Sequence, residues 1–219
     1  MDKKNLFSYS PVRYFENISG SNLKAGEMGL ITAKKGLGKT SILVQFGLDN
    51  LLDDKYLVHV SFDQESSNVI SWYSSILAEI SKKRNVKLEE ISEDIMKKRT
   101  ILNFNQETFT LPKVVNTIKA LKDSGINIYS IILDGLNLDN TKTEDIQCMK
   151  DFIAKENMTA WFSYTCEETE LKNTLDKSKI ELFTTVAHLV PDGKQIYMQL
   201  LKNGDGKVPL DTKTLLMCK

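Results

Sequence analysis

The segment that most limits how this chain can fold is Ala33-Lys34-Lys35-Gly36-Leu37-Gly38-Lys39-Thr40, a glycine-rich stretch between two apolar segments. Residues 28–33 before it form a short apolar run, which predicts a buried strand. Residues 39–52 after it carry apolar side chains at the spacing of a mostly buried helix. The sequence therefore predicts a strand, a tight loop and a helix in direct succession.

This strand, loop and helix match a P-loop, with Ala33 where the usual pattern has its first glycine. Gly36 and Gly38 allow backbone N–H groups to turn toward a phosphate without a Cβ clash. The positive N-terminal end of the helix would face the same anion. The residues expected to bind a nucleotide are Lys35, Gly36, Leu37, Gly38, Lys39, Thr40 and Ser41.

Separate roles are expected for the polar residues of this motif. Lys39 would reach the β- and γ-phosphates, and the Thr40 hydroxyl would bind Mg²⁺. Asp134, directly after the apolar run 131–133, is the expected second metal ligand, in the Walker B position. The alternatives are a Gly-Lys-Thr sequence that occurs by chance in a surface turn, and a carboxylate that only begins a loop.

Two further carboxylates, Asp63 and Glu65, follow the predicted strand 56–62. Carboxylates at the C-terminal end of a parallel strand face the ligand crevice of an open α/β sheet. Either one could orient or deprotonate an attacking water, so both are candidate catalytic residues. The alternative is a helix N-cap, because Asp63, Ser66 and Ser67 precede a predicted helix.

Apolar runs and amphipathic stretches alternate along the rest of the chain. The predicted strands are 56–62, 100–104, 128–134 and 159–165, and the predicted helices are 66–84, 111–124 and 143–157. The tail is predicted to form the strands 184–190, 194–202 and 212–217. This alternation predicts a three-layer α/β/α fold with a mostly parallel sheet and antiparallel C-terminal strands. We expect a single domain over residues 1–219, because no stretch rich in Pro, Gly or Ser divides the chain.

Composition argues against several classes of protein. The 29 basic and 29 acidic residues cancel, which disfavours a strongly basic protein that coats nucleic acid. No apolar run approaches the ~20 residues of a membrane-spanning helix, and the N-terminus leads into no apolar signal core. Three widely separated cysteines favour a reduced, cytoplasmic protein, with the cysteines buried and inert.

The segment Leu23–Met28, followed by Gly-Leu-Ile-Thr-Ala and Gly-Leu-Gly-Lys-Thr-Ser, resembles the RecA-like ATPases of the DnaB helicase and KaiC branch. Residues 59–66 resemble that family's second strand, which ends in a catalytic Glu. Residues 161–165 resemble the strand whose tip carries a polar sensor, near Ser163 or Thr165. Residues 200–204 resemble the hairpin that reaches a neighbouring nucleotide in hexameric relatives. The resemblance implies ATP and Mg²⁺ as cofactors.

Two departures from the family pattern affect the expected activity. Asp63 stands where the family has its catalytic Glu and is one methylene shorter. No Arg follows Arg99, so Lys202 or Lys207 would have to replace the family's arginine finger across a ring or filament contact. Because Lys lacks the planar fork of Arg, we expect a slow or partner-dependent ATPase that acts as a regulatory or assembly switch. The alternatives are a nucleic-acid-dependent ATPase of the DnaB or RecA type and a catalytically inactive nucleotide-binding scaffold.

Several other features are predicted to be structural. Trp72, on the helix 66–84, is expected in the core, and His59 and His188 have no company that suggests metal binding. The basic stretches 82–84 and 97–99 are offset by nearby acidic residues, which predicts a solvated face rather than a nucleic-acid contact.

Overall fold

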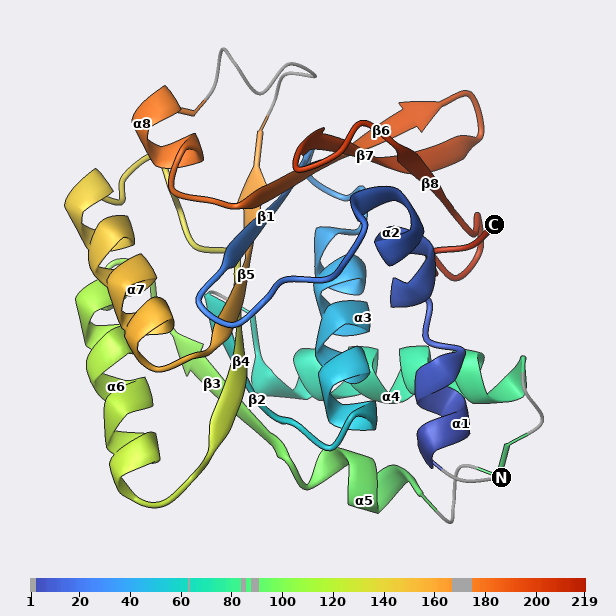
Figure 1. Cartoon of the computed structure of the whole chain (residues 1–219), viewed down its shortest axis with the longest axis horizontal. Coiled ribbons are helices and arrows are strands. Elements are labelled where there is room, and N and C mark those ends of the chain that lie inside the picture. Colours follow the sequence, from blue (N-terminus) through green and yellow to red (C-terminus); the bar gives the residue numbers. More distant parts are fainter. Residues whose placement is uncertain (1–2, 63, 84–85, 88–90, 167–174) are drawn as a thin grey trace.

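The structure, a computed structural model, describes residues 3–62, 64–83, 86–87, 91–166 and 175–219. Its strands are β1 (Met28–Ala33), β2 (Tyr56–Phe62), β3 (Arg99–Phe104), β4 (Ile128–Asp134), β5 (Thr159–Thr165), β6 (Thr185–Asp192), β7 (Gln195–Lys202) and β8 (Lys207–Leu210). They form one sheet in the order β3-β2-β4-β5-β1-β6-β7-β8 (Figure 1). The first six strands in this order pair in parallel, and β7 and β8 add antiparallel. The predicted α/β class, with a mostly parallel sheet and antiparallel C-terminal strands, is confirmed.

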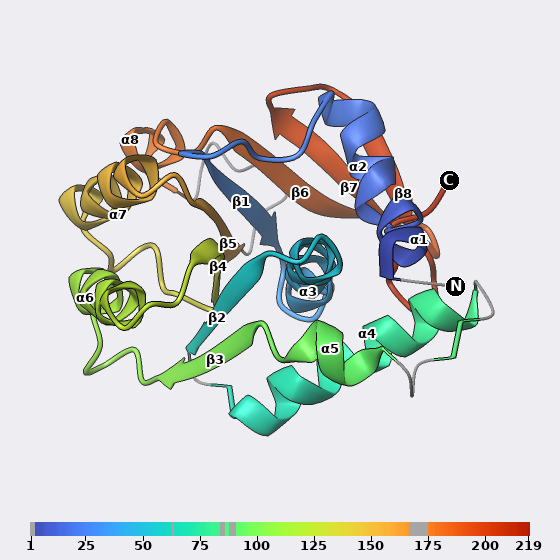
Figure 2. The same ribbon diagram turned by 60° about the horizontal axis from the view of Figure 1, so that its bottom comes forward.

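Helices cover both faces of this sheet (Figures 1 and 2). One face carries α1 (Lys3–Ser8), α2 (Val12–Ser19), α3 (Lys39–Leu52), α4 (Ser66–Lys82) and α5 (Ser92–Met96). The other carries α6 (Leu111–Asp123), α7 (Thr143–Lys155) and α8 (Lys177–Ile180). Within the described part of the chain, none of the helices is long and apolar enough to span a bilayer.

The central strands are apolar throughout because both of their faces are covered. Every residue of β1 is buried, as is nearly every residue of β4. Such continuous apolar runs are typical of parallel strands between two helical layers. On the α3 side, the Trp161 ring stacks on Phe46 with the ring centroids 4.2 Å apart. A Cβ at Gly29 would lie 2.3 Å from the Trp161 ring, so Gly29 of β1 makes room for this packing.

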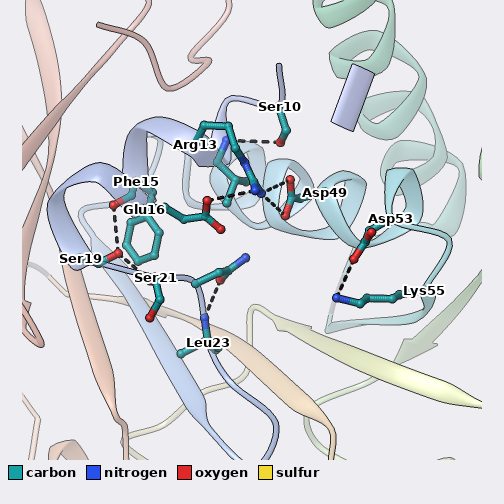
Figure 3. Close-up of polar contacts among 12 residues, drawn as sticks. Ser10, Arg13, Phe15, Glu16, Ser19, Ser21, Leu23, Asp49, Asp53 and Lys55 are labelled. Atoms are coloured by element: carbon teal, nitrogen blue, oxygen red, sulfur yellow. Dashed lines mark hydrogen bonds and ion pairs between the residues drawn. The ribbon is translucent and has the colours of Figure 1, made fainter. Parts of the chain in front are cut away.

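The N-terminal helices are attached to α3 by an ion-pair cluster, which Figure 3 shows in close-up. One guanidinium nitrogen of Arg13 lies 2.7 and 2.8 Å from the two carboxylate oxygens of Asp49 on α3. The other terminal nitrogen lies 3.0 Å from Glu16. Burial raises the pKa of the Asp49 carboxyl, whereas hydrogen bonds from Ser10 and Arg13 oppose this shift. The cluster fixes α2 against the helix that follows the glycine-rich loop.

The tail differs from its prediction. The strands 184–190 and 194–202 correspond to β6 and β7, but the predicted strand 212–217 is wrong. The last strand is β8 at Lys207–Leu210, and residues 211–218 form a turn with a single bridge from Leu210 to Met217. The Asp211 side chain explains the turn, because it accepts the backbone N–H groups of Lys213 and Thr214 and thereby competes with strand pairing.

Two predictions about burial are met only in part. Trp72 packs against the core but is only partly buried, whereas its neighbour Tyr73 is fully buried. Among the cysteines only Cys166 is buried, and Cys148 is exposed on α7. The short helices α1, α2 and α8 had no prediction, because their sequences are too short for a helical period to emerge.

Candidate functional site

The loop between β1 and α3 has a backbone that requires its glycines. Gly36 has φ 85° and Gly38 has φ 96°, angles that strain any residue with a Cβ. Gly38 is the residue directly before α3, so the loop ends where the first N–H groups of the helix have no helical partners. Such a helix start, preceded by a glycine-rich loop, suits an anion.

The Lys39 side chain folds back over this loop. Its Nζ lies 3.1 Å from the carbonyl oxygens of Ala33 and Lys34, to both of which it donates. The ammonium group is therefore held at the loop itself and not extended into solvent. The rest of the predicted segment, from Lys35 to Ser41, forms the loop and the first turn of α3.

Thr40 and Asp134, which lie 94 positions apart in the sequence, meet beside this loop. The Thr40 hydroxyl donates to Oδ2 of Asp134 at 2.7 Å. The Ser163 hydroxyl, from the neighbouring strand β5, donates to Oδ1 at 2.7 Å and accepts the Gly135 N–H at 2.8 Å. Both carboxylate oxygens of the buried Asp134 thus have a hydroxyl partner.

These two residues form a donor set that fits Mg²⁺. A hydroxyl and a carboxylate oxygen are hard ligands, and Mg²⁺ is commonly held by one or two carboxylates while it keeps several waters. Among the described residues there is no group of three or more His, Cys, Asp or Glu side chains that would form an all-protein metal cage. A metal at Thr40 and Asp134 would therefore share its coordination with another ligand.

The sheet topology explains why these residues meet. Strand β5 lies between β1 and β4, so the C-terminal ends of all three strands reach the same edge of the sheet. In open α/β sheets the ligand crevice lies outside this edge. The loop follows β1, Asp134 ends β4, and Ser163 lies near the end of β5.

A cavity of about 890 Å³ opens at this edge. Its volume lies within the ~300–1,000 Å³ that is usual for small-molecule sites. It is lined by the loop residues Lys35, Gly36, Gly38, Lys39, Thr40 and Ser41, by Asp134, Gly135, Ser163 and Thr165, by Phe62, Gln64 and Gln106, by Trp72, Ser75, Ile76 and Glu79 of α4, and by Lys213, Thr214 and Leu215. The cavity is therefore bounded by the strand ends, by one face of α4 and by the C-terminal tail.

The tail is held against α3 by one buried side chain, Gln45. Its amide nitrogen donates to the Leu215 carbonyl, and its amide oxygen accepts the Met217 N–H, both at 2.9 Å. Leu215 in turn packs on the loop, since a Cβ at Gly38 would lie 2.7 Å from its Cδ1. Gln45 thus couples the helix that follows the loop to the tail that forms one wall of the cavity.

The structure describes only one of the two candidate catalytic carboxylates. Asp63 lies outside the described residues. Glu65 is exposed at the N-terminal boundary of α4, where Ser67 donates to its carboxylate at 3.3 Å, and it does not line the cavity. Its position corresponds more closely to the alternative prediction, a residue at the start of a helix. Between them, Gln64 does line the cavity.

Lys202, one of the two lysines expected to act across a subunit contact, is engaged within its own chain. Its ammonium group donates to the carbonyl oxygens of Glu181 and Phe183. Burial lowers the pKa of Lys202 from its usual value. Lys207 remains exposed, at the start of β8.

Two histidines of the sheet, His59 and His188, are buried. Nδ1 of His59, on β2, contacts the Tyr73 hydroxyl at 3.0 Å, and burial lowers the pKa of His59 to about 4. Nδ1 of His188, on β6, contacts the Thr32 hydroxyl at 2.7 Å. Burial, together with the positive charge of Lys39, lowers the pKa of His188. Both imidazoles are therefore neutral near pH 7.

Sequence reasoning missed the α4 wall, the tail and Gln45. One weak signal could have indicated that Trp72 lines the cavity: it lies one residue before the buried Tyr73, at the edge of the apolar face of α4. Gln45 gave a weak signal, since it is a polar residue within the otherwise apolar part of helix 39–52. The tail gave none, because its position depends on contacts with residues about 170 positions away.

Comparison with known proteins adds no relative. No protein-family model matches the sequence, and no curated protein matches it.

Proposed function

We propose that this chain is a RecA-like P-loop protein that binds Mg·ATP. The observation that carries the proposal is the meeting of Lys39, Thr40 and Asp134 at one end of a cavity of nucleotide size. Asp134 lies 94 positions from Thr40 in the sequence, and each of the three residues has the chemistry that the motif requires of it. A chance Gly-Lys-Thr turn would not bring a buried carboxylate to the Thr hydroxyl.

Each residue has a distinct part in the proposed binding. The N–H groups of residues 36–41 and the Lys39 ammonium would bind the phosphates. The hydroxyl of Thr40 and the carboxylate of Asp134 would hold Mg²⁺, which neutralises phosphate charge. Ser163 would fix the orientation of the Asp134 carboxylate through its hydrogen bond to Oδ1.

The cavity also offers contacts for a nucleoside. The partly buried Trp72 supplies an aromatic ring to its lining, and Thr214 and Leu215 of the tail line the same cavity. Aromatic rings stack on nucleobases of any kind. Trp72 therefore supports a nucleotide without selecting its base.

We propose that any hydrolysis is slow or depends on a partner, so that the protein acts as a regulatory or assembly switch. Among the described residues that line the cavity, the cations are all lysines: Lys35, Lys39 and Lys213. Arginine fingers contribute about 10³–10⁵ in kcat, and Lys lacks their planar fork. A second copy of the chain or a protein partner would have to supply the missing group.

A second candidate function is nucleotide binding without catalysis. The position of Glu65 favours it, because this carboxylate is exposed and outside the cavity. Such a chain would bind ATP as a scaffold and release phosphate no faster than background. A nucleic-acid-dependent ATPase is less favoured, since Lys98 is paired with Asp54 and the Arg99 guanidinium lies 4.5 Å from the Tyr73 ring centroid. Arg84 lies outside the described residues.

The proposal is tested by phosphate release from Mg·ATP over a range of protein concentrations, with Lys39→Ala as the inactive control. A rate that rises more than linearly with concentration and vanishes in the variant indicates an ATPase completed across a subunit contact. Background release, with ATP raising the melting temperature of the wild type alone, indicates the scaffold. If ATP neither binds nor stabilises the wild type, the proposed function is wrong.

A further inference from the structure

A second, smaller cavity adjoins the main one. Its volume is about 220 Å³. Four of its lining residues also line the main cavity: Gln106, Gly135, Ser163 and Thr165. This shared boundary includes the chain neighbour of Asp134 and its hydroxyl partner, whereas no residue of α4 or of the tail lines the second cavity. The two cavities therefore meet at the Asp134 end, where the terminal phosphate lies in the proposed function.

The wall of this second cavity is a hydrogen-bonded loop that follows β4. The backbone N–H of Asn137 donates to the side-chain oxygen of Gln106 at 2.8 Å. The Asn137 side-chain oxygen accepts the N–H groups of Asp139 at 3.1 Å and of Asn140 at 3.2 Å. The Tyr164 hydroxyl, from β5, donates to the Asp139 carboxylate at 2.9 Å. The polar groups around the cavity are therefore held in place before any ligand arrives.

A buried lysine fixes the same loop from the opposite side. The Lys179 ammonium, on α8, donates to the carbonyl oxygens of Leu138 at 2.7 Å and of Asp139 at 3.1 Å. Lys179 is only 8% exposed and does not line the cavity. Its ammonium group therefore stabilises the loop that forms the wall and does not face a ligand in the cavity.

The chemistry of the lining limits what can bind. Among the described residues that line the cavity there is one formal charge, the Asp139 carboxylate, and no cation. An anion would have to leave water without a compensating charge, which is costly. Carboxylate and amide oxygens instead accept hydrogen bonds from hydroxyl or amine groups. A cavity of about 220 Å³ is small enough to favour a small polyol or amino alcohol over a larger ligand.

We infer that this cavity binds a small, neutral or cationic molecule with several hydroxyl or amine groups. That this molecule would lie beside a terminal phosphate rests on the proposed function, whereas the binding of the molecule to the cavity does not. Asp139, Gln106 and Asn137 would contact the ligand. The described lining residues include no Lys or Arg, on which phosphate binding depends, so we do not expect a nucleic acid backbone at the same place.

The experiment is a titration with a fixed panel of probes: glycerol, myo-inositol, D-ribose, ethanolamine and choline, with inorganic phosphate and glycerol 3-phosphate as anionic probes. Binding is followed by backbone amide shifts in NMR spectra of the full chain, with and without Mg·ADP. At least one neutral or cationic probe is expected to bind with saturation and to shift the amides of Gly135 and Asn137. Asp139→Asn and Gln106→Leu are each expected to weaken that probe at least tenfold.

Asp151→Asn serves as the matched control, because Asp151 is an exposed carboxylate on α7 that also accepts a side-chain hydrogen bond, from Gln147. This variant should bind the probe as the wild type does. The titration is repeated in Lys39→Ala, so that a failure to bind nucleotide is distinguished from a failure of the second cavity. The inference is overturned if no neutral or cationic probe binds, if binding persists unchanged in both cavity variants, or if only the anionic probes bind there.

Discussion

Removal of the Ser163 hydroxyl is the smallest substitution that we expect to disturb the candidate site. This hydroxyl serves both a buried carboxylate oxygen and the Gly135 N–H. Ser163→Ala would leave both groups without this partner, and we expect it to lower the free energy of unfolding by about 1–3 kcal/mol. It should also raise the Mg²⁺ concentration needed for nucleotide binding, because the Asp134 carboxylate is then free to rotate.

Ser130→Ala is the matched control, since Ser130 is also buried and accepts a hydrogen bond from Thr159 at the other end of β4. Urea unfolding and Mg²⁺ titration of nucleotide binding separate the two effects. We expect Ser130→Ala to cost stability without changing the Mg²⁺ requirement. Equal Mg²⁺ requirements in the two variants would show that Ser163 is structural only.

His59 makes stability depend on pH, in a direction that follows from its burial. Burial lowers the pKa of His59 to about 4, below its ordinary value of 6.5. Between these two values the unfolded chain binds a proton that the folded chain does not, so stability falls as the pH decreases from 6.5 to 4. The slope is up to about 1.4 kcal/mol per pH unit.

His59→Gln removes this titration while it keeps a polar side chain beside Tyr73. We therefore expect the difference in unfolding free energy between wild type and variant to shrink as the pH falls from 7 to 4. Urea unfolding at several pH values measures it. A difference that stays constant over this range would contradict the assigned cause.

At the scale of elements, the hydrogen bonds between α3 and the tail position one wall of the cavity. Gln45→Leu removes both hydrogen bonds to the tail. We expect nucleotide to bind roughly tenfold more weakly, a loss of about 1.4 kcal/mol, because the wall formed by Lys213–Leu215 becomes loose. Inorganic tripolyphosphate should be weakened less than the nucleotide, since it has no nucleoside to contact this wall.

The control is Asn50→Ala, which removes a buried amide on the same helix that donates to the Phe46 carbonyl and, among the described residues, makes no hydrogen bond to the tail. This variant should leave the affinities for nucleotide and for tripolyphosphate in their wild-type ratio. Isothermal titration of both ligands gives that ratio directly. If Gln45→Leu weakens both ligands equally, the tail does not form part of the nucleoside wall.

At the scale of the whole molecule, the N-terminal helices complete the layer in which α3 lies. Arg13 connects α2 to α3 through Asp49, whose side chain is 6% exposed, whereas that of Arg13 is 30% exposed. Removing one partner of a fully buried pair costs ~3–5 kcal/mol, and solvent screening at Arg13 reduces this to about 2 kcal/mol. We expect Arg13→Ala to lower the unfolding free energy by that amount.

Thermal unfolding of Arg13→Ala and Arg13→Lys, at low and at high salt, checks this prediction. Arg13→Lys keeps the charge but has one nitrogen for two carboxylates, so it should lie between wild type and Arg13→Ala. A wild-type melting temperature in Arg13→Ala would mean that Phe15 and its neighbours hold α2 without the ion pair.

Much of this architecture could be predicted from local pattern. The strands 28–33, 56–62, 128–134 and 159–165 coincide with β1, β2, β4 and β5, and the helix 39–52 coincides with α3. These elements are apolar in a periodic way because each is buried between two layers, so burial leaves its trace in the local sequence. The proposed phosphate loop could also be predicted from local sequence, because its glycines are required by the positive φ angles of its own backbone.

Local sequence was enough to predict the alternation of elements, the glycine-rich loop, and Asp134 at the end of a buried strand. The folded chain was needed to show that β5 lies between β1 and β4, that Ser163 bonds Asp134, and that Gln45 holds the tail over the loop. The two kinds of feature depend on interactions of different range along the chain. Backbone angles and helical or strand periods are fixed by neighbours a few positions away, whereas the walls of both cavities are made by side chains that only packing brings together.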